Sequence, residues 1–306
     1  MNEKKLRFLQ KDRIIKGIHN EGYFKVSVVK TTQSVEEARN RHHLSPLASI
    51  LLGKALTGVM LLASELKGEE RLLLRFEGVG PIGHVTVEAN KLGELRGYVG
   101  NADAAIDPTT QKLEDGLGIG LLQATKVLYN QAKPKHSTVE LLFSDISRDL
   151  QFYLQQSEQV NSLITIDIDF NEDGSIAQSG GLIIQMLPGA PTTLFAQLTK
   201  QFEALPRITS LFKDEVMIDE IMEEVTGKLD VRELERYPVD FYCRCSKDRF
   251  ADALALLAVN ELEAMQGKEQ EMNCHYCNEK YTFSKKEIEL IITYKIKLKI
   301  KALSSI

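Results

Sequence analysis

The placement of the cysteines constrains this 306-residue chain more than any other feature. All four lie near the C-terminus in two close pairs, Cys243-Arg244-Cys245 and Cys274-His275-Tyr276-Cys277, with 28 residues between the pairs. Two such pairs can bring four thiolate sulfurs into a tetrahedron, which is the donor set of a structural zinc site. The spacing therefore predicts that one Zn²⁺ is bound, in the reduced protein, by Cys243, Cys245, Cys274 and Cys277.

The first pair is unusual because only one residue separates its cysteines, whereas paired zinc ligands generally have two or more residues between them. Residues i and i+2 reach only the upper part of the Cα–Cα range for disulfides, about 4.4–6.8 Å, so a Cys243–Cys245 bridge would be strained and readily reduced. Positive charge nearby favours the thiolate over the thiol, and the pairs have four basic neighbours: Arg244, Lys247, Arg249 and Lys280. These features indicate a redox switch in which zinc and an oxidant compete for the same sulfurs.

Two other interpretations are compatible with the spacing. A permanently reduced zinc knuckle would only stabilise a small domain. Alternatively, Cys274 and Cys277 are the redox motif of a thioredoxin-like dithiol reductase, which should follow a strand and open a helix. Here the β-prone residues Tyr281-Thr282-Phe283 follow the motif, and a separate helix with a capping box begins at Ser284. The reductase is therefore disfavoured.

Length and composition are those of an ordinary soluble protein with two domains, 43% hydrophobic and 26% charged. The first ten residues are charged and lack an apolar stretch, so we expect no signal peptide and a cytoplasmic location. In that compartment, unbridged cysteines more often serve metal or redox chemistry than structural disulfides. The net charge of −5 argues against a general nucleic-acid-binding protein.

The first 191 residues predict an α+β domain in which antiparallel sheets surround a buried helix. Ser45 and Pro46 form a helix start, and the stretch 46–66 is nearly all apolar. Other periodic segments predict a polar helix at 36–43, a helix with one apolar face at 149–159, and strands within 12–31, 72–77, 83–89, 94–99, 138–143, 163–170 and 180–187, while 121–128 is β-rich but ambiguous. His42 and His43 have no partner at helical spacing, so we expect them to be solvated or at the edge of the core.

Three patterns in this domain imitate functional sites. The stretch 46–66 has the length of a transmembrane helix, but Lys54 at its middle favours a buried helix, and we expect no membrane partner. The run GVGPIG at 78–83 matches the dinucleotide-binding pattern, yet it leads into an alternating strand rather than a helix. The turn beginning at Asp169 resembles a calcium loop, but Gly180 stands where the bidentate glutamate belongs. We therefore expect no nucleotide or calcium site.

Pro188-Gly189-Ala190-Pro191 is the clearest domain boundary. Residues 192–238 follow it, with six Lys and Arg against ten Asp and Glu, and predict an acidic, amphipathic helical linker. Residues 239–306 then form a small zinc domain, in which 249–265 predicts a single helix. The apolar stripes of the linker are either ordinary packing faces or, once released, a large adhesive surface: Leu194, Leu198, Phe202, Met217, Ile218, Ile221 and Met222.

Taken together, these features resemble the bacterial thirty-three-kilodalton redox-regulated heat-shock chaperone family. Its pattern of Cys-x-Cys, a long spacer and Cys-x-x-Cys is met by the four cysteines. Other similar stretches are FEGVGPIG (76–83), SEQV (157–160), GGLIIQMLPG (180–189), CSKDRF (245–250) and CHYCNEKY (274–281). The resemblance spans roughly residues 10–292.

The resemblance implies an ATP-independent holdase rather than an enzyme. In such proteins the reduced, zinc-bound domain keeps the linker folded on the N-terminal domain, and the chaperone is idle. Oxidation forms next-neighbour disulfides, here Cys243–Cys245 and Cys274–Cys277, and expels zinc. The zinc domain and linker then unfold, the active form dimerises, and unfolding client proteins bind the exposed apolar surface. On this interpretation the seven residues of the linker stripes are candidate client-binding residues.

The end of the chain departs from the family pattern. From Tyr294 to Lys301, lysines alternate with apolar residues, which predicts a disordered or edge-strand tail with four lysines on one face. This tail and the basic neighbours of the cysteines support a rival hypothesis, a zinc-stapled nucleic-acid-binding module. The leading expectation is that the chain has no nucleic-acid partner.

Overall fold

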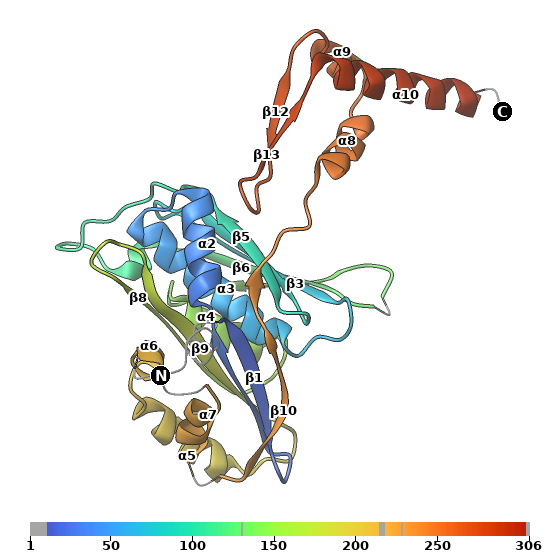
Figure 1. The fold of residues 1–306 in the computed structure, drawn as a ribbon. Coiled ribbons are helices and arrows are strands. Elements are labelled where there is room, and N and C mark those ends of the chain that lie inside the picture. The colour runs from blue at the N-terminus through green and yellow to red at the C-terminus, as the bar shows by residue number, and fades with distance from the viewer. Residues whose placement is uncertain (1–10, 130, 214–217, 228, 304–306) are drawn as a thin grey trace, which may run out of the picture. The chain divides into compact units, whose positions relative to one another are not determined.

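The computed structural model describes residues 11–129, 131–213, 218–227 and 229–303 (Figure 1). For residues 213, 218, 219 and 296–303 it describes the backbone only. The chain divides into two compact units, residues 1–242 and 243–306. The predicted linker, 192–238, therefore belongs to the same compact unit as the N-terminal domain. The predicted α+β class with antiparallel sheets is confirmed.

Two sheets form the larger unit, in the orders β10-β1-β2-β9-β8 and β11-β5-β4-β3-β6-β7. Neighbouring strands are antiparallel except for the β11–β5 pair, among the described residues. The strands of the first sheet are β1 (Arg13–His19), β2 (Phe24–Lys30), β8 (Ser162–Phe170), β9 (Ile176–Met186) and β10 (Val231–Pro238). Those of the second are β3 (Arg71–Gly78), β4 (His84–Asn90), β5 (Glu94–Val99), β6 (Gly120–Val127), β7 (Lys135–Glu140) and β11 (Asp240–Phe241).

The glycine-rich run 78–83 is the turn between β3 and β4, so the predicted meander is confirmed. Gly80 lies against the short helix η1 (Leu113–Gly116). A Cβ atom on Gly80 would lie 2.4 Å from the carbonyl oxygen of Gly116, which explains why only glycine fits. These glycines therefore serve the turn between two strands and, at Gly80, a close approach of two backbone segments.

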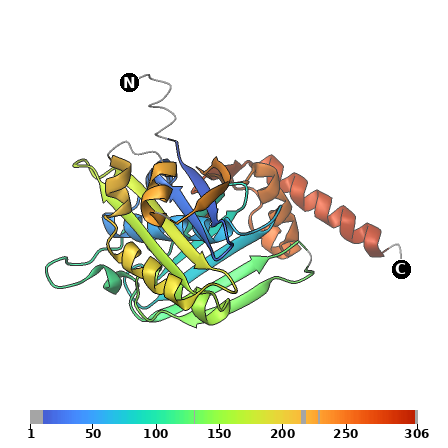
Figure 2. The same cartoon turned by 90° about the horizontal axis from the view of Figure 1, so that it is seen from below.

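Helix α3 (Pro46–Ala63) is the centre of the larger unit and lies between the two sheets (Figure 2). The Ser45 hydroxyl accepts a hydrogen bond from the Ala48 N–H at 3.2 Å, and Pro46 fills the first turn. Among the described helices, α3 is long and apolar enough to cross a membrane, but 83% of it is buried in the fold. The expectation of a buried core helix is confirmed.

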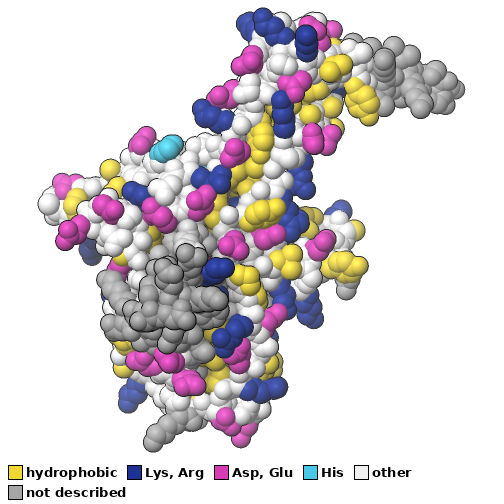
Figure 3. Space-filling model, viewed as in Figure 1, with side chains coloured by type: hydrophobic (Ala, Val, Ile, Leu, Met, Phe, Trp, Pro, Cys, Tyr) yellow, Lys and Arg dark blue, Asp and Glu magenta, His cyan; other side chains and the backbone are white. Residues whose placement is uncertain are grey.

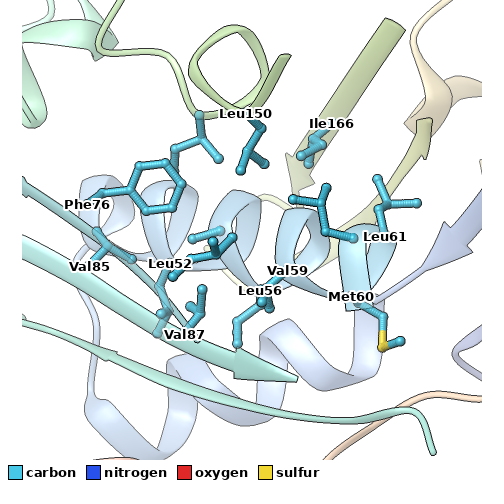
Figure 4. Close-up of a cluster of buried hydrophobic side chains, with 14 of the residues drawn as sticks. Leu52, Leu56, Val59, Met60, Leu61, Phe76, Val85, Val87, Leu150 and Ile166 are labelled. Atoms are coloured by element: carbon cyan, nitrogen blue, oxygen red, sulfur yellow. The ribbon is translucent and has the colours of Figure 1, made fainter. Parts of the chain in front are cut away.

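The core around α3 is a continuous apolar cluster (Figure 4). Leu52 and Leu56 are buried on α3, and the second sheet contributes Phe76, Val85 and Val87 to the same cluster. Helix α4 (Ile146–Ser157) and β8 add the side chains labelled Leu150 and Ile166 in the figure. Burial of one helix from both sides explains why its apolar residues are not confined to a single stripe.

The N-terminus of helix α2 (Thr32–His42) is capped by the carboxylate of Asp12, a residue outside the helix. Asp12 is 3% exposed and accepts hydrogen bonds from the N–H groups of Gln33 (3.1 Å) and Ser34 (2.7 Å), and from the Ser34 hydroxyl (2.8 Å). Burial raises the pKa of Asp12 to about 7, although these hydrogen bonds act in the opposite direction. His42 and His43 lie at the C-terminal end of α2, in agreement with their expected place at the edge of the core.

The predicted linker folds onto the first sheet. Helices α5 (Thr192–Glu203), α6 (Ile208–Lys213) and α7 (Ile218–Thr226) place their apolar side chains against β2, β8 and β9 in a second core cluster. Residues 231–238 do not continue the helices but form β10, so a wholly helical linker is wrong for this stretch. The reason is tertiary: β1 offers a free edge, and β10 pairs with it along its whole length.

The smaller unit contains α8 (Lys247–Leu256), α9 (Val259–Ala264), the hairpin β12 (Gln270–Asn273) and β13 (Lys280–Phe283), and α10 (Lys285–Leu303). The predicted single helix 249–265 is therefore wrong. Leu257 and Ala258 adopt extended backbone angles, and the Glu261 carboxylate caps the second helix by accepting from the Ala258 N–H at 2.7 Å. A local cap thus outweighs the continuous apolar stripe.

The tail forms the C-terminal part of α10, so the predicted disordered or edge-strand tail is also wrong. The helix begins at a capping box, in which Ser284 and Glu287 each accept from the other's N–H. Further along the helix, the Lys295 ammonium donates to the carbonyl oxygens of Ala255 and Leu257 at the end of α8, which fixes α10 against α8. Ile288 and Ile292, also on α10, are buried in the small apolar cluster of this unit. These contacts outweigh the period-two pattern.

Replacing a core side chain should destabilise the larger unit. Leu56 is completely buried on α3, so Leu56→Ala should lower the free energy of unfolding by about 2–5 kcal/mol through lost burial and a residual cavity. Leu92, which is 57% exposed, is the matched control, and Leu92→Ala should change it by less than about 0.5 kcal/mol. Urea denaturation followed by circular dichroism measures both. Equal effects of the two substitutions would contradict a core centred on α3.

Asp12 should make stability depend on pH with a defined sign. Its pKa in the fold, about 7, lies above its ordinary value of 3.8, so folding favours the protonated carboxyl. The stability that Asp12 contributes is therefore complete below its ordinary pKa and is lost as the pH rises through about 7. Asp12→Asn cannot ionise. The unfolding free energy of the wild type should fall relative to this variant between pH 4 and 8 in urea titrations, and a difference that does not vary with pH would refute the assignment.

Candidate metal centre

The four cysteines converge in the smaller unit. Their four sulfur atoms all lie within 4.8 Å of one another. The Sγ atoms of Cys243 and Cys274 are 3.7 Å apart, and those of Cys245 and Cys277 are 3.3 Å apart. Cys274 and Cys277 are buried, whereas Cys243 and Cys245 are half-buried. The predicted cluster is thus brought together by the fold.

Each pair of cysteines is positioned by a different local structure. Cys274 and Cys277 lie in the turn between β12 and β13, which is closed by hydrogen bonds from the Cys274 N–H to the Glu279 carbonyl (2.9 Å) and from the Asn278 N–H to the Cys274 carbonyl (2.7 Å). Asn278 takes a left-handed φ of 56°, which this residue type tolerates. The pair Cys243 and Cys245 precedes α8 in an extended segment.

Backbone N–H groups point at the sulfurs of the turn. The amides of Tyr276 and Cys277 donate to the Cys274 sulfur, and the amide of Glu279 donates to the Cys277 sulfur. Such outer hydrogen bonds orient thiolate ligands and offset part of their charge in zinc knuckles. The turn is therefore built to hold anionic sulfur.

The electrostatics of the protein alone oppose ionisation. Burial raises the pKa of the Cys277 and Cys274 thiols, and the nearby Cys243 raises both further. The prediction that basic neighbours favour the thiolates is wrong for these two residues. Two of those neighbours are engaged elsewhere, because the Lys247 ammonium lies 2.6 Å from the Glu287 carboxylate and Lys280 lies 3.0 Å from Glu271.

A divalent cation reverses this balance, since a coordinated thiol is deprotonated outright. The residues fit such an ion: four sulfur donors from two segments and converging backbone N–H groups form a closed set of the kind that structural sites use. Cys243, Cys245, Cys274 and Cys277 are thus able to hold a metal ion together.

Tyr281 is a further member of the site that the sequence did not single out. Its hydroxyl donates to the Cys245 sulfur at 3.2 Å, which together with burial raises the pKa of Tyr281. Its ring packs at 5.0 Å from that of Phe250 on α8, so it links one cysteine pair to the apolar cluster of the unit. Its period-two spacing from the buried Phe283 on β13 is the signal that would place Tyr281 on the buried side of the hairpin.

The Cys-x-x-Cys pair is not arranged as in a dithiol reductase. It occupies a turn within a β-hairpin, and the next helix, α10, begins only at Lys285. A redox motif of the thioredoxin type would open a helix instead. The structure therefore argues against that alternative, as the sequence does.

The candidate client-binding residues are distributed over α5 and α7. Leu198, Ile221 and Met222 are buried in the second core cluster, and Leu194 and Phe202 are half-buried beside it. Met217 lies outside the described residues, as does the side chain of Ile218. The described stripes are thus packing faces in this structure, covered by the first sheet.

Comparison with known proteins places these features in a family. The family model described as "Hsp33 protein" matches residues 12–284. The chain belongs to the Hsp33 family. It is 35% identical over 92% of its length to the "33 kDa chaperonin" of Desulforamulus reducens, of which it covers 97%, and 37% identical over 91% to that of Bacillus velezensis, again covering 97%.

A solved structure agrees with this assignment. The crystal structure of the 33 kDa chaperonin, or heat shock protein 33 homologue, of Thermotoga maritima has a TM-score of 0.86 and 30% identity to this chain. It covers 94% of this chain, which in turn covers all of that one. The Hsp33 chain described here is therefore a member of a bacterial chaperone family, and the resemblance found in its sequence is confirmed.

The metal centre of this Hsp33 chain can be tested with Co²⁺ as a spectroscopic probe. The reduced protein should bind one equivalent of Co²⁺ and show thiolate-to-cobalt charge-transfer absorption, because four sulfurs form the donor set. Cys274→Ser should weaken binding and reduce the band. His275→Ala is the matched control within the same turn and should leave the spectrum unchanged. Loss of the band in His275→Ala would show that the donor set is not the four cysteines.

Proposed function

We propose that this chain is a redox-regulated, ATP-independent holdase that prevents unfolding proteins from aggregating during oxidative stress in the cytoplasm. The observation that carries the proposal is the convergence of four cysteine sulfurs within 4.8 Å in a chain of the Hsp33 family. The reduced, zinc-bound form is inactive. Oxidation of the sulfurs switches on client binding, and the chain has no catalytic turnover of its own.

Zn²⁺ is the proposed metal because it favours a closed set of four thiolates. Cys243, Cys245, Cys274 and Cys277 hold it. When bound, zinc neutralises buried thiolate charge and cross-links the extended segment to the hairpin, and structural zinc contributes about 10–16 kcal/mol of apparent binding free energy to folding. The smaller unit depends on this contribution because few of its described apolar side chains are fully buried: Leu254, Leu262, Phe283, Ile288 and Ile292.

Oxidation removes the ligands. With hydrogen peroxide, two thiolates lose one electron each and join as a disulfide, while the peroxide takes up both electrons and two protons and leaves as two waters. Two such steps convert the four sulfurs into Cys243–Cys245 and Cys274–Cys277, the pairing that the family resemblance implies. In the reduced structure all four sulfur atoms already lie within 4.8 Å of one another. Either disulfide therefore forms between sulfurs that the fold has brought together.

Loss of the zinc cross-link unfolds the smaller unit, and the linker follows. Release of α5 and α7 exposes the apolar side chains that they bury against the first sheet, including Leu198, Ile221 and Met222. The exposed surface binds unfolding clients through apolar contact, which needs no sequence match. Two activated chains associate through the same kind of surface, so the active form is a dimer.

A nucleic-acid-binding module is less well supported. The prediction of four lysines on one face assumes a strand, whereas these positions belong to the helix α10, on which positions two apart lie about 200° apart around the axis. On the face shown in Figure 3, basic and acidic side chains of the described residues are interspersed rather than gathered by sign. Nucleic acid is therefore not a proposed partner, and neither is a membrane.

The switch is tested by comparing the reduced and the peroxide-treated protein with a heat-unfolded client. Light scattering should show aggregation with the reduced form and suppression with the oxidised form. Oxidation should release one Zn²⁺, detected with a chromogenic chelator, as four thiols disappear. Cys274→Ser with Cys277→Ser should prevent full oxidation. Equal protection by the reduced and the oxidised wild type would refute a redox switch.

A further inference from the structure

The outer edge of β8 carries backbone groups that side chains, rather than a strand, satisfy. β8 is the last strand of its sheet and pairs only with β9 among the described strands. The Ile164 N–H donates to the side-chain carbonyl of Gln151 on α4 at 2.7 Å. The Ile168 carbonyl accepts from the Arg207 guanidinium at 3.3 Å. Each side chain supplies the group that an added strand would supply from its backbone.

A cavity of about 400 Å³ lies beside the first residues of this edge. The half-buried aromatic rings of Phe143 and Phe152 line it from the α4 side, and Phe195 closes it from α5 only while the linker is folded. Ser162 also lines it, and this side chain is 7% exposed with a hydroxyl that has no hydrogen-bond partner among the described residues. A recess that combines aromatic rings with polar side chains and an unsatisfied buried hydroxyl is suited to a peptide segment, which brings both apolar side chains and backbone donors.

The other end of the edge is acidic. Asp167 and Asp169 lie on one face of β8 with side chains only 19% and 14% exposed, and Arg207 lies 3.4 Å and 2.7 Å from their carboxylates. The Ile208 N–H at the start of α6 also donates to Asp167, at 2.9 Å. Arg207 therefore holds the segment between α5 and α6 on the sheet through charge and through the Ile168 carbonyl.

We propose that the β8 edge is a binding site for extended client segments that carry an apolar residue and, further along, a lysine or arginine. This inference rests on the proposed holdase function. Arg207 is an internal substitute for the client: it occupies the acidic end while the linker is folded, and it leaves when the linker is released. The two partly buried carboxylates then lose the Arg207 guanidinium, and a basic client side chain takes its place.

The geometry sets the spacing of such a segment. The cavity is lined by Asn161, Ser162 and Leu163, four to eight residues before the two aspartates. At about 3.3 Å per residue, the apolar anchor and the basic residue are separated by about 13–26 Å of extended chain. Backbone pairing accepts many sequences, which suits a chaperone, whereas the aspartates add a preference for positive charge.

The test uses the oxidised full-length protein and two labelled nine-residue peptides. Both alternate Val and Thr and contain one Phe; five residues further along, one peptide has Arg and the other Glu. In fluorescence anisotropy, the Arg peptide should bind at least about fivefold more tightly. Asp167→Asn with Asp169→Asn should abolish the preference. Glu140→Gln, which neutralises an exposed acid on the edge strand β7 of the other sheet, should retain it.

Hydrogen exchange locates the peptide and identifies its competitors. Exchange in residues 161–170 should slow when the Arg peptide is added, while exchange in β7 should not change. Equal binding of the Arg and Glu peptides by the wild type would overturn the proposal even if the aspartate variant does not fold. Protection of the outward-facing amides of Ile166 and Ile168 before any peptide is added would also overturn it, because these amides do not pair with β9 and the linker or a second copy would then occupy the edge.

The same preparation separates this inference from the proposed function. If the oxidised protein suppresses aggregation of a heat-unfolded client but the β8 edge shows no peptide protection, the site is wrong and the holdase stands. If the oxidised protein does not suppress aggregation, the holdase is refuted, and the client site is refuted with it.

Discussion

The smaller unit depends on one electrostatic constraint: four sulfurs lie within 4.8 Å of one another, two of them buried. Their thiolates repel one another, and burial opposes their ionisation, so the protein alone raises the pKa of Cys274 and Cys277. A bound divalent cation offsets both the repulsion between the thiolates and the cost of burying their charge. Oxidation to disulfides eliminates the same two costs by making the sulfurs neutral. Metal binding and oxidation exclude each other, because a disulfide sulfur is no longer a thiolate ligand. This exclusion is the physical basis of the proposed switch.

The larger unit shows how a single segment can be both a packing element and a restraint. Helices α5 and α7 cover apolar residues of the first sheet, while Arg207 binds the acidic end of β8. The same release would therefore uncover apolar surface and a strand edge together. Contact with apolar surface gives affinity but does not orient the bound chain. A strand edge with two carboxylates fixes the orientation of an added strand and favours positive charge in it. A chaperone that uses both would hold clients in an extended form.

Sequence reasoning was most accurate where one local pattern had only one physical solution. The apolar run after Ser45-Pro46 became the buried helix α3, and the alternating segments around the glycine-rich run became a meander. It failed where two local signals competed. The stripe over 249–265 is broken by a cap at Ala258, and the alternating tail became helical because Lys295 binds the end of α8. The strand β10 could not be foreseen, since its partner β1 lies more than 200 residues earlier.

The sequence by itself determined which four cysteines converge and the family of the chain, because these depend on residue type and spacing along the chain. Only the tertiary structure decided which groups surround those cysteines and what the linker covers. The Tyr281 hydroxyl at Cys245, the ion pairs that engage Lys247 and Lys280, and Arg207 on the β8 edge all join residues distant in sequence. Spacing restricts only near neighbours, so the partners of these side chains are set by how the chain packs.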